Sequence, residues 1–155
     1  MNDIIFRLFQ STDIYALQQL MQTTINTCYA SYPPEYRQHW MDDHHSSDHI
    51  LQEAAEGFTL VIERHGKIIG TGNIMHDWIQ SILIHPEYQR QGYATELIHR
   101  LEEQARQKGV NRVQLTALPP AKSFFEHLGY HTISEHHFKA EHLRQFTYYR
   151  MEKQI

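Results

Sequence analysis

The sequence is poor in cysteine, has no surplus of positive charge and contains no long apolar run. Cys28 is its one cysteine, so no disulfide can form within the chain. Lys and Arg together number 14 against 18 Asp and Glu, a balance that argues against an electrostatic nucleic-acid binder. No apolar run approaches the roughly 18 residues of a membrane-spanning helix, and the opening residues lack the features of a signal peptide. We therefore expect a cytoplasmic protein with neither nucleic acid nor membrane as a partner.

The chain does contain enough apolar residues for one core. With 155 residues and 41% hydrophobic content, residues 1–155 are expected to form a single domain. Apolar spacing and turn residues predict strands over residues 4–8, 58–64, 67–75, 78–84, 113–118, 130–135 and 146–151. They predict helices over residues 14–28, 34–40, a piece ending near 56, 94–108 and 121–128. This order is typical of a mixed α/β domain.

A glycine stands at the mouth of the long helix that follows the strand over residues 78–84. Gly92 lets the backbone approach a bulky group closely, and the first turn of a helix has amide groups without partners inside the helix. These amides and the positive end of the helix dipole favour an anion such as a pyrophosphate, to which Arg90 would add a full charge. A turn that merely needs glycine explains the same residues equally well. Neither GxxxxGK[ST] nor GxGxxG is present, so a P-loop or dinucleotide site is not expected.

The stretch QRQGYA, residues 89–94, resembles the Q/R-x-x-G-x-G/A acyl-CoA motif of the GNAT acetyltransferase superfamily. It follows a strand and HPEY, and the later AKSFFEHLGY resembles the second motif of that family. YPPEYRQHW and the closing FTYYRMEK add a likeness to small bacterial acetyltransferases of the YafP-like kind. The resemblance implies a mixed, mostly antiparallel central sheet of about seven strands with helices on both faces. It also implies acetyl-CoA as co-substrate and no metal.

The resemblance further implies which residues would bind acetyl-CoA. The pantetheine arm would lie beside Ile82, Leu83 and Ile84. The pyrophosphate would rest on the amides of Gln91, Gly92, Tyr93, Ala94 and Thr95, with Gln89 and Arg90 at the rim. The end of the pantetheine arm would pass Leu118, Ser123, Phe124 and Phe125.

The implied reaction is direct attack of an amine on the thioester. Attack needs a neutral amine, and therefore a proton acceptor or a desolvating pocket. Gln80 stands where relatives often have a carboxylate and cannot accept a proton, so Asp77 is the nearest acidic substitute, although a solvated turn residue is the simpler interpretation of Asp77. Phe125 and Leu118 replace a frequent tyrosine acid and a frequent asparagine, and neither can donate a proton. Asp77 and Gln80 are thus the implied catalytic positions, with no single side chain expected as an essential base.

Aromatic and histidine-rich stretches offer further candidates. Tyr32 and Tyr36 belong to the helix pair that covers the acceptor in relatives, so the resemblance implies a substrate pocket there, with core packing as the alternative. Thirteen histidines include His44 and His45 beside Asp42 and Asp43. A second group joins His136, His137 and His142. No HExxH or cysteine-bearing zinc pattern accompanies them, so surface histidines without metal are expected.

Two functions from different classes follow. The first is an N-acetyltransferase that moves an acetyl group from acetyl-CoA to an amine of a small molecule or peptide. The second is a non-catalytic acyl-CoA-binding sensor or partner module, which the glutamine at position 80 and the phenylalanine at position 125 favour. Whether the chain forms a homodimer stays open.

Overall fold

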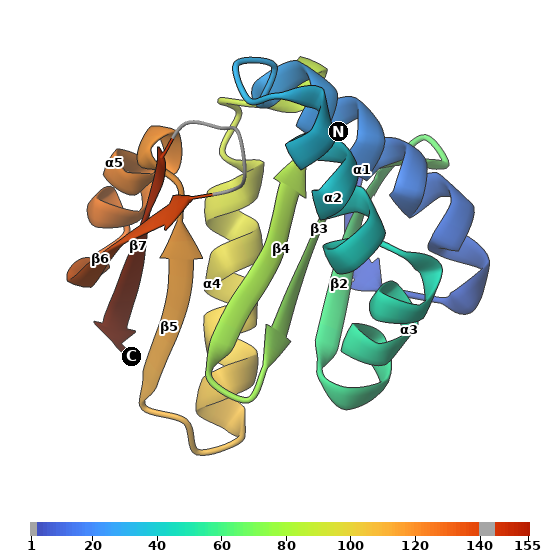
Figure 1. Cartoon of the computed structure of the whole chain (residues 1–155). Helices are drawn as coiled ribbons and strands as arrows, with labels where there is room; N and C mark the ends of the chain where they lie inside the picture. Colours follow the sequence, from blue (N-terminus) through green and yellow to red (C-terminus); the bar gives the residue numbers. More distant parts are fainter. Residues whose placement is uncertain (1–2, 140–144) are drawn as a thin grey trace.

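Seven strands form one open sheet in the computed structural model, which describes residues 3–139 and 145–155 (Figure 1). The strands are β1 (Ile4–Leu8), β2 (Phe58–Arg64), β3 (Lys67–Met75), β4 (Trp78–Ile84), β5 (Arg112–Ala117), β6 (His131–Lys139) and β7 (Gln145–Gln154). Their order across the sheet is β1-β2-β3-β4-β5-β7-β6, and every neighbouring pair is antiparallel except the parallel pair β4–β5. This mostly antiparallel sheet confirms the fold class expected from the sequence.

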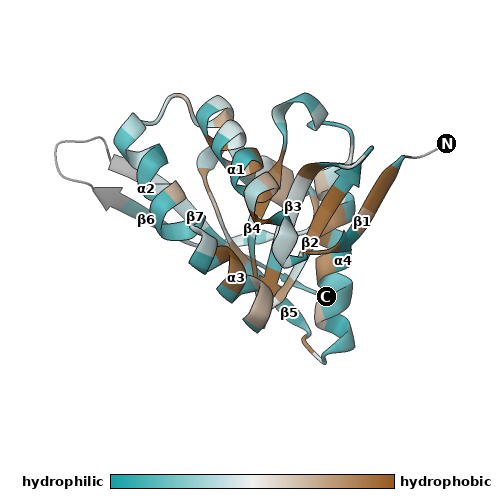
Figure 2. Cartoon of the chain, turned by 90° about the vertical axis from the view of Figure 1, so that its right-hand side faces the viewer, coloured by the Kyte–Doolittle hydropathy of each residue, from teal (hydrophilic) through white to brown (hydrophobic). Residues whose placement is uncertain are grey.

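Helices cover both faces of the sheet. Among the described residues they are α1 (Ile14–Cys28), α2 (Pro34–His44), α3 (Ser47–Glu56), α4 (Tyr93–Gln107) and α5 (Pro119–His127). Alternation along β2 separates two cores, because Leu60 and Ile62 pack in the cluster of α4 and α5, whereas Val61 packs in the cluster of α1, α2 and α3. Figure 2 shows β1 and β2 largely in brown, the colour of hydrophobic residues. No helix in residues 3–139 and 145–155 has the length and apolar character needed to cross a membrane.

β4 and β5 are neighbours at one end only. Their register contains one pair, Trp78 with Gln114, and the backbone amide of Gln114 donates to the carbonyl oxygen of Asp77 over 2.8 Å. Beyond this pair the two strands diverge, as Figure 1 shows toward the top of the view. β5 instead stays paired with β7 as far as Ala117 and Tyr149. The sheet is therefore open between two central strands, and this opening positions the site.

A bulge interrupts β4 beside the opening. Leu83 pairs with Thr71 and Gln80 pairs with Asn73, so β4 has one more residue than β3 between these pairs. Ser81, within the bulge, has a φ of 57°, in the left-handed region that serine rarely adopts. The bulge directs the Ser81 hydroxyl to α3, where it donates to the carboxylate of Glu53.

The second helix is longer than the sequence predicts. We expected it to end at Trp40, but α2 continues to His44. Two i,i+4 contacts stabilise the extra turn: the side-chain amide of Gln38 donates to Asp42 over 2.9 Å, and His39 contacts Asp43 over 3.0 Å. This extension carries His44 and the following His45 to the edge of the sheet opening, where both line the cavity described next.

Candidate active site

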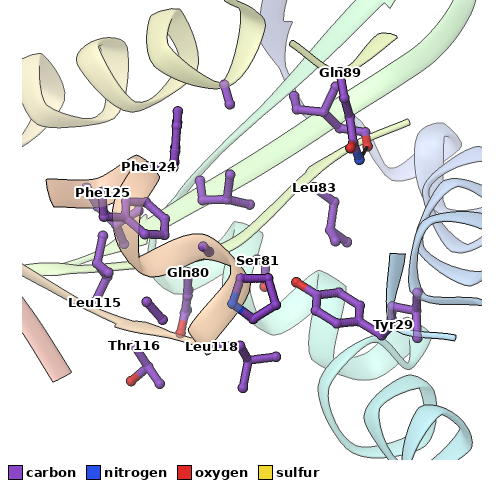
Figure 3. A pocket seen from close by; sticks show the side chains of 18 of the residues that line it. Tyr29, Gln80, Ser81, Leu83, Gln89, Leu115, Thr116, Leu118, Phe124 and Phe125 are labelled. Carbon is purple, nitrogen blue, oxygen red and sulfur yellow. Dashed lines mark hydrogen bonds between the residues drawn. The ribbon is translucent and has the colours of Figure 1, made fainter. Parts of the chain in front are cut away.

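A cavity of about 940 Å³ has both β4 and β5 in its walls. It also draws lining residues from α1, α2, α3, α4 and α5, so segments far apart in the sequence meet there. Figure 3 shows Tyr29 entering from the side of α1, with its hydroxyl toward the interior, and Phe124 and Phe125 entering from the side of α5. The cavity is large enough for an extended organic ligand.

One end of the cavity is made of backbone. Gly92 precedes the first turn of α4 with a φ of 88°, a conformation that glycine adopts without strain. The amide of Glu96 donates to the carbonyl oxygen of Gly92 over 3.1 Å, in the first turn of the helix. The amides of Tyr93, Ala94 and Thr95 come before it, in residues that line the cavity. This end of α4 therefore presents backbone donors and a positive dipole end to the cavity.

Gln89 holds the loop before α4 in place. Its side-chain amide donates to the carbonyl oxygen of Ile84 over 2.8 Å and contacts the sulfur of Cys28 over 3.2 Å. These contacts join the end of β4, the loop and the end of α1. Arg90, next in the chain, is exposed and has a φ of 61°. Gln89 thus positions the loop, whereas Arg90 supplies charge at its rim.

The structure brings most of the sequence-predicted residues into this cavity. Those that line it are Gln80, Ile82, Leu83, Ile84, Gln89, Arg90, Gly92, Tyr93, Ala94, Thr95, Leu118, Phe124 and Phe125. Those outside the lining are Tyr32, Tyr36, Asp77, Gln91 and Ser123. Tyr36 is buried in the protein, and the ring of Tyr32 lies edge-on to the rings of Tyr29 and Trp40, which do line the cavity.

Asp77 lies at the closed end of the sheet opening. Its carboxylate accepts from the side-chain amide of Gln114 over 2.9 Å. The Gln114 side-chain oxygen accepts in turn from Nε of Arg150 over 2.9 Å, and the Arg150 guanidinium also packs over the ring of Trp78. Asp77 is thereby engaged in joining β4 to β5, at the point where the two strands still pair.

Gln80 lines the cavity and is linked to α3. Its side-chain amide donates to the side-chain oxygen of Asn73 over 3.0 Å. The Asn73 amide donates to the backbone carbonyl oxygen of Glu53 over 3.1 Å and to the hydroxyl of Thr59 over 2.8 Å. Gln80 therefore takes part in a buried chain of hydrogen bonds that fixes α3 against the sheet.

Sequence reasoning missed a buried carboxylate in the wall. Glu53 of α3 lines the cavity and is only 5% exposed. Its carboxylate accepts from the Ser81 hydroxyl at 3.0 and 3.1 Å, and Nε2 of His49 lies 3.0 Å from Oε1. Burial raises the pKa of the Glu53 carboxyl, against the lowering effects of Ser81 and His49. The spacing of His49 and Glu53 was the one available signal, but many exposed helical pairs share it.

Two further histidines surround this carboxylate end. Burial lowers the pKa of His45 to about 4, and the neighbouring His44 and His49 act in the same direction. Nδ1 of His45 is buried without a hydrogen-bond partner in the described structure. Burial also lowers the pKa of His44, whose ring lies edge-on to that of His49 at 6.0 Å. At neutral pH this wall is therefore poor in positive charge.

Phe125 is a buried ring in the opposite wall. Its ring lies 5.2 Å from that of Phe124 and 5.8 Å from that of Tyr130. The Tyr130 hydroxyl donates to Glu102 over 2.8 Å, away from the cavity lining. Phe125 thus gives the cavity an apolar surface, while the hydroxyl-bearing residues in the lining are Tyr29, Ser81, Tyr88, Tyr93, Thr95 and Thr116.

Within residues 3–139 and 145–155, no three His, Cys, Asp or Glu side chains lie close enough to hold a metal ion together. His44 and His45 lie at the cavity, whereas His136 stacks on Tyr148 at a ring separation of 5.0 Å. His142, the third member of the second histidine group, lies outside the described residues.

The sheet splits at a single parallel pair and a helix start faces the split, which is the arrangement implied by the resemblance to GNAT acetyltransferases. The model of the acetyltransferase (GNAT) family matches residues 18–130. The chain therefore belongs to the GNAT acetyltransferase family, which confirms the family expected from its motifs. The finer likeness to YafP-like proteins stays a prediction.

Solved structures share this fold over almost the whole chain. A GCN5-related N-acetyltransferase from Rhodopseudomonas palustris is 20% identical with a TM-score of 0.87, covering 100% of this chain and 98% of its own. PaiA N-acetyltransferase from Thermoplasma acidophilum, crystallised with coenzyme A, is 19% identical with a TM-score of 0.82, covering 100% of both chains. The yncA acetyltransferase of Salmonella typhimurium, crystallised with acetyl-CoA, is 16% identical with a TM-score of 0.76, covering 99% and 94%. At such identities the likeness shows the fold.

Proposed function

We propose that the chain is an acetyl-CoA-dependent N-acetyltransferase that acts on an amine of a small molecule or peptide by direct attack. One observation carries the proposal: a single cavity has the amide-bearing start of α4 and a buried carboxylate in its walls, with the open edges of β4 and β5 between them. Family membership supports acetyl transfer, and the complexes of PaiA with coenzyme A and of yncA with acetyl-CoA support the donor.

In this proposal the amides of residues 91–95 bind the pyrophosphate, with Arg90 adding charge at the rim. The pantetheine arm lies along Ile82, Leu83 and Ile84, in the part of β4 that is not paired with β5. The thioester end passes Leu118 and the apolar rings of Phe124 and Phe125. The acetyl group then reaches the part of the cavity next to the Ser81 bulge.

A thiol-release assay with calorimetry tests the proposal. We expect calorimetry to show acetyl-CoA binding, and the chain to release free thiol when given propylamine, spermidine, an aminoglycoside, amino acid amides and short peptides. Binding without thiol release across the whole panel would instead indicate the alternative, a non-catalytic acyl-CoA sensor. No binding of acetyl-CoA would overturn both functions. A single domain over residues 1–155 and a cytoplasmic location stay predictions of the sequence.

A further inference from the structure

Glu53 is a carboxylate in a buried position, where the ionised form is energetically unfavourable. Its side chain is 6% exposed, and burial of an ionised group is unfavourable unless partners compensate for lost water. Ser81 and His49 provide contacts at 3.0 to 3.1 Å, and neither carries the fixed positive charge that Arg or Lys would bring. A purely structural carboxylate in such a place usually has a cationic partner, as Glu102 has in Lys153 over 3.0 and 3.1 Å. Glu53 instead lines the cavity.

The cavity chemistry around Glu53 suits a cation. Of the described lining residues, Glu53 is the one with a carboxylate. Tyr29 and Trp40 also line this cavity, with ring centroids 5.4 Å apart in an edge-on arrangement. Aromatic faces and a carboxylate together favour an ammonium group. The lowered pKa values of His44 and His45 reduce competing positive charge there.

Resting on the proposed function, we propose that Glu53 is the proton acceptor for a cationic primary amine, which binds as ammonium in the cavity beside Glu53, and that His49 passes the proton to water. His49 is suited to this transfer because its side chain is 34% exposed while its Nε2 lies 3.0 Å from Oε1 of Glu53. Ser81 orients the carboxylate from the bulge of β4.

An ammonium acceptor must lose two protons from nitrogen before the amide is formed. One N–H proton of the ammonium moves to the Glu53 carboxylate and then to Nε2 of His49, whose imidazolium releases a proton from Nδ1 to water. The neutral nitrogen forms a bond to the thioester carbonyl carbon, and the carbon–sulfur bond breaks. The second N–H proton lost from nitrogen is taken up by the departing thiolate, so the products are the amide, coenzyme A thiol and one proton in water.

Among the described residues, the titratable side chain in contact with Glu53 is His49, on α3 itself. His44 and His45, at the end of α2 and in the residue after it, interact with His49. Burial raises the pKa of the Glu53 carboxyl, which makes its ionised form a stronger base than an exposed glutamate. The group is therefore suited to accept a proton from an ammonium, and its own protonation should limit turnover on the acid side.

The central test compares Glu53→Gln with Glu56→Gln, an exposed glutamate on the same helix. With acetyl-CoA and propylamine, Glu53→Gln should lower kcat by about a hundredfold or more, as expected on loss of a general base. Glu56→Gln should stay within about twofold, and both should bind acetyl-CoA like the parent in calorimetry. With trifluoroethylamine, which is largely neutral at pH 7, the deficit of Glu53→Gln should shrink. A merely structural role for Glu53 would slow both amines equally.

His49 has its own signature. His49→Ala should lower kcat with propylamine by about tenfold, and imidazole in the buffer should restore part of the rate because it can take the proton from Glu53. Loss without rescue by imidazole would overturn the transfer through His49. Ser81→Ala keeps the carboxylate and should change kcat far less than Glu53→Gln.

A measurement without any acceptor separates this inference from the proposed function. NMR titration of side-chain carboxyl carbons should show the pKa of Glu53 raised above the ordinary value of a glutamate. A parent that releases thiol with the panel amines while Glu53→Gln does so at the same rate would overturn the inference alone. A parent inert toward every amine would overturn the proposed function, and a Glu53 carboxyl whose pKa is not raised would then overturn the inference as well.

Discussion

The two ends of the cavity differ in the chemical groups that they present to a ligand. The α4 end, residues 89–95, presents backbone amides and a helix dipole, and its conformation depends on one glycine at a φ of 88°. The α3 end, formed by His45, His49 and Glu53, presents titratable side chains, of which Glu53 is buried and the two histidines are partly buried. Backbone donors do not titrate, whereas the α3 end carries groups whose pKa values burial has moved.

This contrast explains which chemistry each end can perform. An anion needs fixed donors that hold the same charge at every pH, and helix N-termini meet that need. Proton transfer needs groups that can change charge near neutral pH, and buried carboxylates and histidines are such groups. The molecule thus separates binding of the donor from proton transfer along one cavity.

The largest effect should come from the glycine at the α4 end. Gly92→Val forces a β-branched residue into a left-handed conformation, which costs roughly 1–2 kcal/mol, and displaces amides whose bonds to an anion are worth about 1.5–3 kcal/mol each. We expect acetyl-CoA affinity to fall by about a thousandfold in calorimetry.

Gly109→Val is the matched control. Gly109 follows the other end of α4 with a φ of 80° and, like Gly92, has no atom within 4 Å of an added Cβ. The two variants should lose similar thermal stability, while only Gly92→Val loses acetyl-CoA. Equal losses of affinity would show that general loosening of α4, and not its start, determines binding.

The second effect belongs to the α3 end and to pH. Because burial lowers the pKa of His45 to about 4 from 6.5, the folded protein binds fewer protons than the unfolded chain between these values. Neutral His45 makes its full contribution to the free energy of unfolding above about pH 6.5. This contribution is lost as the pH falls toward 4. Over this window His45 should contribute about 2–3 kcal/mol to the fall in unfolding free energy.

Denaturant unfolding of His45→Gln at several pH values measures this contribution. The variant should show a shallower pH dependence than the parent between pH 7 and pH 4. His99→Gln, at an exposed position on α4, should keep the parental slope. Identical slopes for the parent and His45→Gln would place the acid sensitivity elsewhere in the protein.

The smallest effect should come from Arg90. It is exposed, and exposed charge pairs contribute about 1 kcal/mol or less, so Arg90→Gln should weaken acetyl-CoA binding by about fivefold or less. The loss should diminish as salt is raised, because salt screens exposed charges but leaves backbone donors in place. Arg106→Gln, in the last turn of α4, serves as control. A loss as large as that of Gly92→Val would make charge, and not the amides, the main determinant.

The fold was largely predictable because its elements carry strong local signals. Ile4–Leu8 and Ile14–Cys28 begin and end where apolar spacing and capping residues place them, and the hairpin of β2 and β3 turns at His65 and Gly66 as expected. The end of α2 was misjudged because its last turn depends on the pairs Gln38–Asp42 and His39–Asp43 rather than on a break in polarity.

The α4 end was readable for a related reason, since a glycine before an amphipathic helix is a local pattern. The α3 end was not. Glu53 looks like any surface glutamate in its own helix, and its hydrogen bond to Ser81, 28 residues later in the chain, forms only in the folded protein. A carboxylate becomes a candidate base when tertiary packing buries it, and neither residue spacing nor composition predicts such burial.

The split in the sheet also determines how the molecule carries mechanical load. The strands β1 to β4 form one half-sheet and β5, β7 and β6 form the other, and a single register pair, Trp78 with Gln114, joins them through the backbone. Tension applied across the sheet must pass through that pair, the side chains of Asp77 and Arg150 bound to Gln114, and the packing of α4 beneath both halves. A ligand lying in the opening would give the two halves a second connection, so that an occupied molecule is stiffer across the sheet than an empty one.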